Sequence, residues 1–433
     1  MVDPSSLSAT EASQLMKKGL LTSVKLVESC LSRISMRDPA VQAWQVVDEE
    51  GALAAARKCD ADERRGPLHG IPVGMKDIID TCDIMTAYGS PIYKDNQPSS
   101  DSACVALTRE AGGIILGKTV STEFATRHPG KTRNPHNLDH TPGGSSSGSA
   151  AAVADFMVPL ALGTQTTGSV IRPSAYCGVV GYKPSFGYVN RTGVKPLSDS
   201  LDTIGFHARS VADIGLYFSV LSGRTPVDFE GEQSRIQAWR IGYCRTPMWD
   251  RADAETHALL ENAAGRLTNA GAEVAEIVLD PAFEKGTASQ DIIAEFETWR
   301  ALAFERTQHP DKLSPALTER LERAGNRSVP DYENARLHAE ECRRKIAAIF
   351  KDWDALLVPA APGSAPEGLA YTGDPVFSQL WTLLQGPAIT IPAGASGNGM
   401  PLAVQLIGNY RKDEDLLRCA NWAEMILRDQ NLS

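Results

Sequence analysis

The chain has 433 residues, 42% of them hydrophobic and 22% charged, an ordinary composition for a globular protein with a sizeable core. Its net charge of −10 argues against a general nucleic-acid or acidic-membrane surface. No run of residues is long and apolar enough to span a membrane, and the first residues lack the basic and apolar regions of a secretory signal. The eight cysteines are scattered without a Cys-x-x-Cys pair, so we expect a cytoplasmic protein without a disulfide framework or a zinc knuckle.

Capping and periodicity signals predict the elements of the N-terminal part. Ser8 and Glu11 form a capping-box pattern that begins a short helix ending at Gly19. A second helix carries apolar side chains on one face, at Leu26, Val27, Cys30, Leu31 and Ile34. The apolar run 71–76 is expected to be extended and ends on Lys76. In all, the pattern predicts helices over 8–19, 22–36, 48–65 and 101–111 and a buried strand over 113–117.

The C-terminal part alternates helices with short apolar strands. The pattern predicts a βαβ-like unit of strand, helix and strand, then a further helix and strand, at 239–244, 253–270, 273–278, 331–351 and 355–359. The polar segment 280–330 is expected to form helices at the periphery. Such alternation predicts an α/β fold, a single large domain whose central mixed β-sheet is covered by helices on both faces.

Two serine clusters set in glycine are the strongest functional signal. They are Gly-Gly-Ser-Ser-Ser-Gly at 143–148 and Gly-Thr-Gln-Thr-Thr-Gly-Ser at 163–169, joined by the apolar stretch 150–162. Glycine lets the backbone approach a ligand and present consecutive N–H groups, and a serine hydroxyl can attack or relay a proton. Hydrolysis of an acyl bond needs this pairing of a nucleophile with amide donors.

Several other motifs lack the context that their chemistry needs. Residues 112–119 match the P-loop pattern, but a helix precedes them and the loop itself has a strand pattern, so nucleotide binding is not expected. Residues 144–148 fit a nucleophile elbow, yet none of the later histidines is framed by glycine or in an exposed loop, namely His207, His257, His309 and His338. Cys177 is an alternative nucleophile in an apolar stretch, where cysteine usually packs. No cluster of His, Asp or Glu has metal-ligand spacing.

Without a histidine base, Lys76 is the candidate that activates serine. It ends the apolar run 71–76 and precedes Asp77. A lysine that faces a core loses the hydration of its charged form, which lowers its pKa and makes the neutral amine available as a base. The structural alternative is that Lys76 extends toward solvent or pairs with Asp77.

These motifs together resemble the amidase signature family of serine hydrolases. The resemblance runs over nearly the full length and is carried by Leu68–Asp77, Thr122–Ala125, Pro142–Ala150, Gly163–Pro173, Gly178–Pro184, Leu201–Gly205 and Gln385–Pro392. It implies a single amidase domain over 1–433. Within it we expect a signature core over about 65–210, a variable peripheral region over about 210–350 and a C-terminal segment, 351–433, that returns to the sheet.

The resemblance also implies roles for individual residues. Ser169 matches the nucleophile, Ser145 the bridging serine, which follows a cis peptide bond, and Lys76 the base. The backbone N–H groups of the loop match the family's oxyanion hole, at Thr166, Thr167, Gly168 and Ser169. The sequence departs from many relatives in having Gln165 in place of Asp and Thr167 in place of Gly.

Arg172 leaves two interpretations open. With the Thr-Gln-Thr pattern it resembles the small bacterial malonamidase branch, in which the matching arginine receives a substrate carboxylate. A structural role, bound to a nearby carbonyl or acidic residue, is the alternative.

Our functional hypothesis is a serine amidohydrolase that cleaves a small amide through an acyl-enzyme. One alternative is an aryl-amide, ester or carbamate hydrolase with the same triad. Another is the catalytic A subunit of a tRNA-dependent amidotransferase, against which the short chain argues, and a third is an inactive binding module. We expect a small-molecule amide as substrate, no cofactor or metal, and no nucleic-acid or membrane partner; a homodimer is left open.

Overall fold

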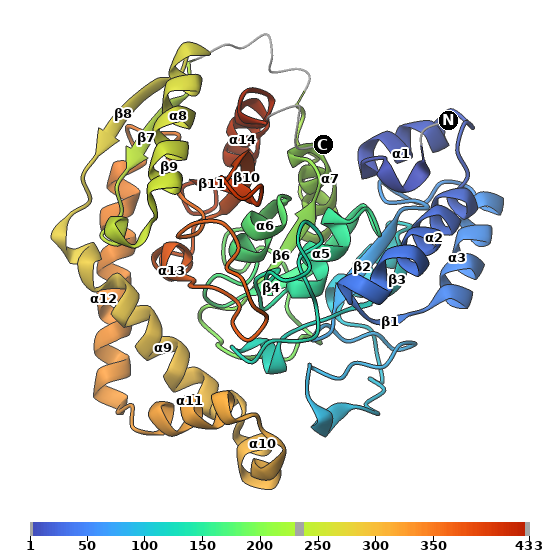
Figure 1. The fold of residues 1–433 in the computed structure, drawn as a ribbon, viewed down its shortest axis with the longest axis horizontal. Coiled ribbons are helices and arrows are strands. Elements are labelled where there is room, and N and C mark those ends of the chain that lie inside the picture. Colours follow the sequence, from blue (N-terminus) through green and yellow to red (C-terminus); the bar gives the residue numbers. More distant parts are fainter. Residues whose placement is uncertain (1–2, 230–237, 429–433) are drawn as a thin grey trace.

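One mixed sheet of eleven strands runs through the protein (Figure 1). The computed structural model describes residues 3–229 and 238–428. The strands are β1 (Trp44–Val47), β2 (Pro72–Lys76), β3 (Ile114–Thr119), β4 (Leu160–Gln165), β5 (Val180–Lys183), β6 (Thr203–Ala208), β7 (Arg240–Cys244), β8 (Glu273–Ile277), β9 (Ala355–Pro359), β10 (Ala388–Ala395) and β11 (Pro401–Ile407). Their order in the sheet is β1-β3-β2-β4-β6-β5-β10-β11-β9-β7-β8.

The α-helices of the described residues connect these strands. They are α1 (Ala9–Lys17), α2 (Ser23–Val41), α3 (Glu49–Ala61), α4 (Ala103–Glu110), α5 (Ser147–Ala154), α6 (Ile171–Cys177), α7 (Val211–Ser222), α8 (Ala254–Asn269), α9 (Gly286–Ala301), α10 (Ala303–Gln308), α11 (Pro315–Gly325), α12 (Val329–Ile349), α13 (Val376–Leu383) and α14 (Asp413–Leu427). Within the described ranges, none of these helices combines the length and the apolar character that a membrane span requires.

The strand pairing confirms the predicted mixed sheet. β2 lies between β3 and β4 and runs parallel to both, and β7 runs parallel to β8 and β9, as the predicted βαβ unit requires. The pairs β4–β6, β5–β6, β10–β5 and β10–β11 are antiparallel. Because β2 and β4 are parallel neighbours, their C-terminal ends lie side by side although the two strands are far apart in the sequence.

Helices cover the sheet on both faces, as successive side chains of β6 show. Phe206 packs its ring edge against Tyr217 of α7, with ring centroids 5.3 Å apart. The next residue, His207, contacts the hydroxyl of Ser174 in α6. Because neighbouring strand residues point to opposite faces, α6 and α7 lie on opposite sides of the sheet.

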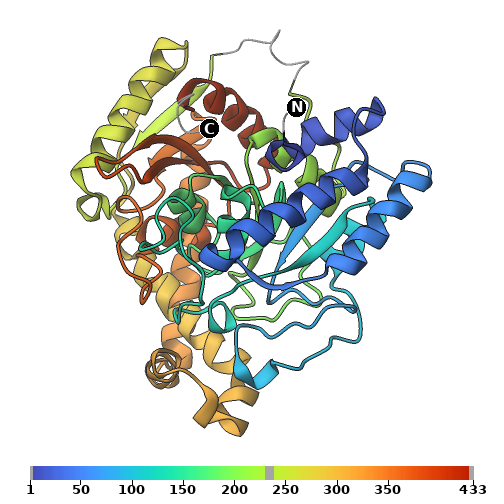
Figure 2. The same ribbon diagram turned by 45° about the vertical axis from the view of Figure 1, so that its right-hand side comes forward.

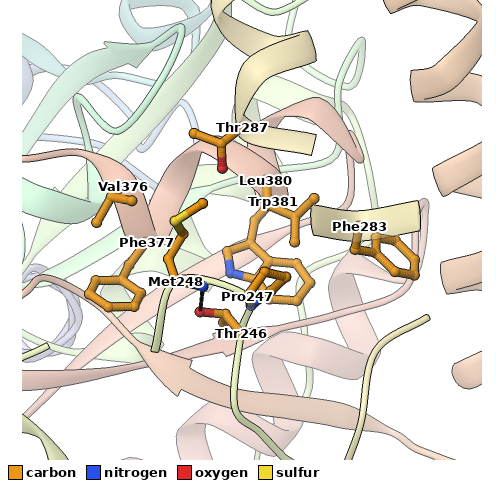
Figure 3. A pocket seen from close by; sticks show the side chains of 9 residues that line it. All are labelled: Thr246, Pro247, Met248, Phe283, Thr287, Val376, Phe377, Leu380 and Trp381. Atoms are coloured by element: carbon orange, nitrogen blue, oxygen red, sulfur yellow. Dashed lines mark hydrogen bonds between the residues drawn. The ribbon is translucent and has the colours of Figure 1, made fainter. Parts of the chain in front are cut away.

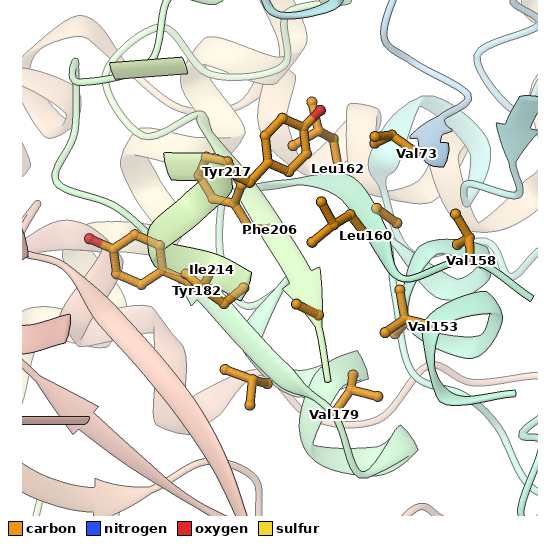
Figure 4. Close-up of a cluster of buried hydrophobic side chains, with 14 of the residues drawn as sticks. Val73, Val153, Val158, Leu160, Leu162, Val179, Tyr182, Phe206, Ile214 and Tyr217 are labelled. Atoms are coloured by element: carbon orange, nitrogen blue, oxygen red, sulfur yellow. The ribbon is translucent and has the colours of Figure 1, made fainter. Parts of the chain in front are cut away.

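The main core lies between β2, β4 and β6 and their covering helices. Figure 4 shows Leu160 and Leu162 of β4 close to Phe206 and Tyr217, all of them fully or almost fully buried. A core of large apolar side chains in contact is densely packed and changes shape little. It therefore gives a rigid base to the ends of β2 and β4.

The predicted N-terminal helices form, and two of them differ in length from the prediction: the helix predicted over 48–65 ends four residues earlier, at Ala61 of α3. The capping box of Ser8 and Glu11 begins α1 as expected. The second helix was predicted to end at 36, but α2 continues to Val41. Its last turn is held because the Asp38 carboxylate accepts from Ala43 N and Trp44 N beyond the helix. Figure 2 shows these first helices in blue against the neighbouring strands.

The segment predicted to be helical at the periphery forms a helical arm, defined here as α9, α10 and α11 (residues 286–325). In Figure 1 it extends away from the sheet, in yellow and orange. Its contacts nevertheless reach back to the core: Glu305 of α10 accepts from Tyr93 and Lys195. Ser314, the N-cap of α11, donates its backbone N–H to the carboxylate of Glu123. The arm is thus attached to the main body of the protein at Tyr93, Glu123 and Lys195.

Candidate active site

Lys76 is the last residue of β2 and is completely buried. Its Nζ lies 2.7 Å from Ser145 Oγ and 2.8 Å from Thr164 Oγ1. Burial lowers the pKa of Lys76 well below its ordinary value, and the Asp202 carboxylate opposes this effect only in part. Such an amine is available in its neutral form, which can accept a proton. The expected alternative pairing with Asp77 is not what the structure has, because Asp77 lies 3.8 Å from a different lysine, Lys118.

Ser145 lies two residues before the start of α5, and the peptide bond between Gly144 and Ser145 is cis, as the family resemblance implied. The carbonyls on either side of this bond are both held. Gly144 O accepts from Arg172 Nη2 at 2.6 Å, and Ser145 O accepts from the backbone N–H of Thr122 at 3.2 Å. The hydroxyl of Ser145 is therefore fixed beside the Lys76 amine.

Ser169 lies in the loop between β4 and α6, on the wall of a cavity of about 200 Å³. Its carbonyl accepts from Ser146 N at 3.3 Å, which ties this loop to the segment that carries Ser145. In residues 3–229 and 238–428, no hydrogen bond joins the Ser169 hydroxyl to Ser145. The structure thus brings Lys76 and Ser145 into contact and places Ser169 at the cavity, while a proton relay from Ser169 stays a prediction.

The loop that leads to Ser169 lies beside this cavity and carries backbone N–H groups without acceptors among the described residues. Thr166, Thr167 and Gly168 line the cavity, and the N–H groups of Thr167, Gly168 and Ser169 have no acceptor within the described part of the chain. Gln165 shapes the loop, because its side-chain oxygen accepts from Val170 N and Ile171 N, at 2.9 and 3.1 Å. Consecutive unpaired N–H groups at a cavity wall can bind a developing oxyanion.

Charged side chains from several elements surround the cavity, and sequence reasoning missed most of them. They are Arg127, Arg172, Asp291, Arg320 and Asp374, with Tyr371 beside them. Burial and the neighbouring Arg127 lower the pKa of Arg320 to about 10. Burial raises the pKa of Asp291, an effect that Arg127 opposes. Arg127 lies two residues after the motif 122–125 and could have been found there, but Asp291 and Arg320 belong to the helical arm, where no motif marked them.

Arg172 satisfies part of both interpretations. Its Nη2 donates to Gly144 O and to Thr372 Oγ1, the latter at 3.3 Å, which is the structural role. Its Nε is buried without a hydrogen-bond partner among the described residues, and the side chain lines the cavity. The contacts of Nη2 thus support the structural role, and the carboxylate-binding role stays a prediction.

Further cavities include one beside the Ser169 cavity and one farther from it. One of about 320 Å³ shares Ala125, Thr166 and Leu197 with the Ser169 cavity and reaches Thr164, whose hydroxyl contacts Lys76. The other is small and mostly apolar; Figure 3 shows Trp381, Phe377 and Met248 around it. Its described lining residues include no serine and no titratable side chain.

The alternative reactive residues have structural partners instead. His207 is buried, its Nδ1 lies 2.8 Å from Ser174 Oγ, and burial together with the Lys76 charge lowers its pKa to about 3. Burial raises the pKa of Cys177, whose thiol donates to Pro142 O. Residues 114–119 form β3, so the P-loop pattern is a strand here. In the described residues one exposed group has metal-ligand geometry, formed by Cys82, Asp83 and Asp101, but Arg109 pairs with both of its carboxylates.

Comparison with known proteins identifies the family of the chain. The family model described as Amidase matches residues 25–417. The glutamyl-tRNA(Gln) amidotransferase A subunit of Symbiobacterium thermophilum is 34% identical, with 96% of each chain covered. Native peptide amidase from Stenotrophomonas maltophilia superposes with a TM-score of 0.84 at 29% identity, covering 98% of this chain and 97% of that one. A structure described as a vestigial protein complex related to an s-triazine catabolic enzyme superposes with a TM-score of 0.90 at 28% identity, covering 98% and 100%.

These comparisons correct one argument from the sequence. The chain was expected to be short for an amidotransferase A subunit, but the match covers 96% of that relative's length. Length therefore does not count against that alternative. Nothing in the comparisons singles out the malonamidase branch, which stays a prediction.

Proposed function

The chain belongs to the amidase family, and we propose that it hydrolyses the C–N bond of a small amide through an acyl-enzyme on Ser169. The observation that carries the proposal is the buried Lys76 amine, 2.7 Å from Ser145 Oγ at the end of β2. A buried lysine with a lowered pKa beside a serine supplies the base that the histidines of this chain do not.

The proposed reaction moves one proton through two hydroxyl groups. Neutral Lys76 takes the proton of Ser145, which takes that of Ser169, and Ser169 Oγ attacks the amide carbonyl carbon. The carbonyl oxygen becomes an oxyanion that the N–H groups of the 166–169 loop bind. The proton then returns through Ser145 to the leaving nitrogen, because an unprotonated amide anion is too basic to leave. Water enters by the same route, releases the acyl group as a carboxylic acid and restores Ser169.

The charges around the cavity support a small polar acyl group. Arg127, Arg172 and Arg320 offer donors to a substrate carboxylate, and Asp291 and Asp374 offer acceptors to an ammonium group. An amide that carries both groups, such as the side-chain amide of an amino acid, matches this set. The same acyl chemistry applies to aryl amides, esters and carbamates, but an apolar aryl acyl group would bury charged side chains without partners.

A second candidate is the catalytic A subunit of a tRNA-dependent amidotransferase. The observation that favours it is the set of amidotransferase A subunits from Symbiobacterium thermophilum, Synechococcus and Roseiflexus castenholzii, which are 32–34% identical over 95–98% of this chain. In that role the same site would release ammonia from an amino-acid amide for use by a partner protein. The two candidates share their chemistry and differ in whether the chain works alone.

Hydrolysis by the purified chain separates the candidates. A panel of amino-acid amides, anilides, esters and carbamates is tested with the wild type and with Ser169→Ala. We expect the wild type to hydrolyse small charged amides and the variant to lose this activity. Turnover that survives in Ser169→Ala would refute the proposed nucleophile. The amidotransferase role predicts three results. The purified chain by itself has weak activity, other proteins co-purify stoichiometrically with the tagged chain from its own cells, and their addition raises its activity. These results together would establish that role.

A further inference from the structure

A residue of the helical arm forms hydrogen bonds with the loop that carries the free N–H groups. Gln290, in α9, is completely buried. Its Nε2 donates to Thr166 O at 3.0 Å and to Thr167 Oγ1 at 3.1 Å. A buried amide with both contacts made fixes the Thr166 carbonyl in one direction.

A second residue holds the next carbonyl of the same loop. Thr382, near the end of α13, donates its hydroxyl to Thr167 O at 2.8 Å. The same hydroxyl accepts from Gln165 Nε2 at 3.0 Å, so its direction is set as well. Two successive carbonyls of the loop are therefore anchored by side chains that lie far away in the sequence.

The geometry of the peptide bond means that fixing a carbonyl group also fixes the direction of the N–H group that follows it. In a trans peptide the C=O and the following N–H point in opposite directions. The Thr166–Thr167 and Thr167–Gly168 bonds are trans, because the cis bond among the described residues is Gly144–Ser145. Holding Thr166 O outward therefore turns Thr167 N–H the other way, and holding Thr167 O does the same for Gly168 N–H. Both of these N–H groups are unpaired and belong to residues that line the Ser169 cavity.

The direction of the Gln290 amide is itself determined. Gln379 Nε2 donates to Gln290 Oε1 at 3.2 Å and to Asp291 Oδ1 at 2.9 Å. A flipped Gln290 would place its NH2 against the NH2 of Gln379 and its oxygen against Thr166 O, so the flip would replace favourable contacts by repulsive ones. Through Gln379 the same network reaches Asp291, a charged wall of the cavity.

We infer that Gln290 and Thr382 are positioning residues that aim the N–H groups of Thr167 and Gly168 at the oxyanion formed on Ser169. This rests on the proposed function of Ser169 and adds to it the residues that orient its oxyanion donors. Neither residue touches the reacting atoms; each acts through the carbonyl that it holds.

The test removes one hydrogen bond at a time without changing side-chain volume greatly. The variants are Gln290→Met, Thr382→Val and the conservative Thr382→Ser, with Gln308→Met as the matched control on an exposed position of the same arm. The probe is a fluorophosphonate, whose phosphoryl oxygen occupies the place of the oxyanion when Ser169 Oγ displaces fluoride. The rate of labelling is measured with kcat and KM for the best amide of the panel, and thermal melting checks the fold.

We expect Gln290→Met and Thr382→Val each to slow labelling and to lower kcat by about 10- to 100-fold, less than the loss of a donor itself. KM should stay within about 3-fold, because the ground-state amide gains little from the oxyanion donors. Thr382→Ser and Gln308→Met should label at nearly the wild-type rate. Labelling of Gln290→Met at the wild-type rate, with Ser169→Ala unlabelled, would overturn the inference alone. Labelling that persists in Ser169→Ala would overturn the proposed nucleophile and the inference with it.

Discussion

Lys76 Nζ and Ser145 Oγ lie 2.7 Å apart although 69 positions separate them in the sequence. The contact exists because β2 ends on Lys76 and pairs with β4, while Ser145 lies just before α5, which contacts both strands. Burial of this amine beside hydroxyl groups lowers its pKa, because the charged form loses its hydration. Its protonation and its contact with Ser145 can therefore both be tested, by substitution and by pH.

Replacing Lys76 by methionine should abolish activity and stabilise the fold. The proposed base is lost, so turnover should fall by about 10³-fold or more. In the unfolded chain the amine has its ordinary pKa near 10.4 and is protonated at pH 7, whereas burial lowers the pKa in the folded chain. Unfolding therefore takes up a proton, and the unfolding free energy falls as the pH drops from about 10 toward the folded pKa. Lys76→Met removes this proton uptake, so it should raise stability at pH 7 and weaken the fall of the unfolding free energy with falling pH.

Urea unfolding and amide turnover measure both effects, and the exposed Lys131→Met is the control. Near-normal turnover in Lys76→Met would show that another group is the base.

The pH dependence of the rate should report a lysine and not a histidine. Because the proposed base must be neutral, kcat/KM should fall as the pH drops through the lowered pKa of Lys76. His207 has a pKa of about 3 and is neutral across the working range. His207→Asn should therefore leave the acid limb of the profile in place. A shift of that limb on changing His207 would assign it to the imidazole instead.

The arginines around the cavity should differ in what they do. Arg127→Met and Arg320→Met should raise KM about 10-fold or more for amides that carry a carboxylate, and leave neutral amides unchanged. Arg172→Met should impair all substrates, because Gly144 O also loses its donor next to Ser145. Steady-state kinetics on paired charged and neutral amides decide this, with the exposed Arg323→Met on α11 as the control. An Arg172 effect confined to charged amides would assign it to substrate binding alone.

Glu424 should make the fold less stable as the pH rises toward neutrality. Burial raises its pKa from 4.5 to about 7, against the contacts with Val211 N and Arg428. Between these two values the folded chain holds a proton that the unfolded chain has lost, so the unfolding free energy falls with rising pH. Glu424→Gln should remove most of that fall. Unfolding curves at pH 5 and pH 7.5 measure it, and an unchanged pH slope in the variant would contradict it.

Local signals made much of the fold predictable. The capping box of Ser8 and Glu11 begins a helix because it satisfies two backbone donors at once, wherever the helix packs. The apolar run that ends on Lys76 forms the buried strand β2, as its composition predicts. Glycine in the serine clusters also has a local reason: a Cβ at Gly148 would lie 2.1 Å from Ala43 O. The length of α2 was missed because Asp38 caps beyond its end, which periodicity does not reveal.

The site was only partly predictable. Motifs identified Lys76, Ser145 and Ser169 as candidates, but their distances depend on the order of strands in the sheet. Asp291, Arg320 and Gln290 belong to the helical arm. The periodicity of a helix predicts which side chains are buried but not which residues they contact. Only the packed chain brings that arm to the loop.

The attachment of the helical arm bears on how enzymes of this architecture can be re-engineered. The helical arm supplies two charged residues of the cavity wall, Asp291 and Arg320. It also supplies Gln290, which holds the carbonyl before a backbone donor. In the proposed mechanism, selectivity and turnover therefore both depend on this one insert. A chimera that received a foreign arm without a donor equivalent to Gln290 would accept a new acyl group and yet process it slowly, until that one amide was restored.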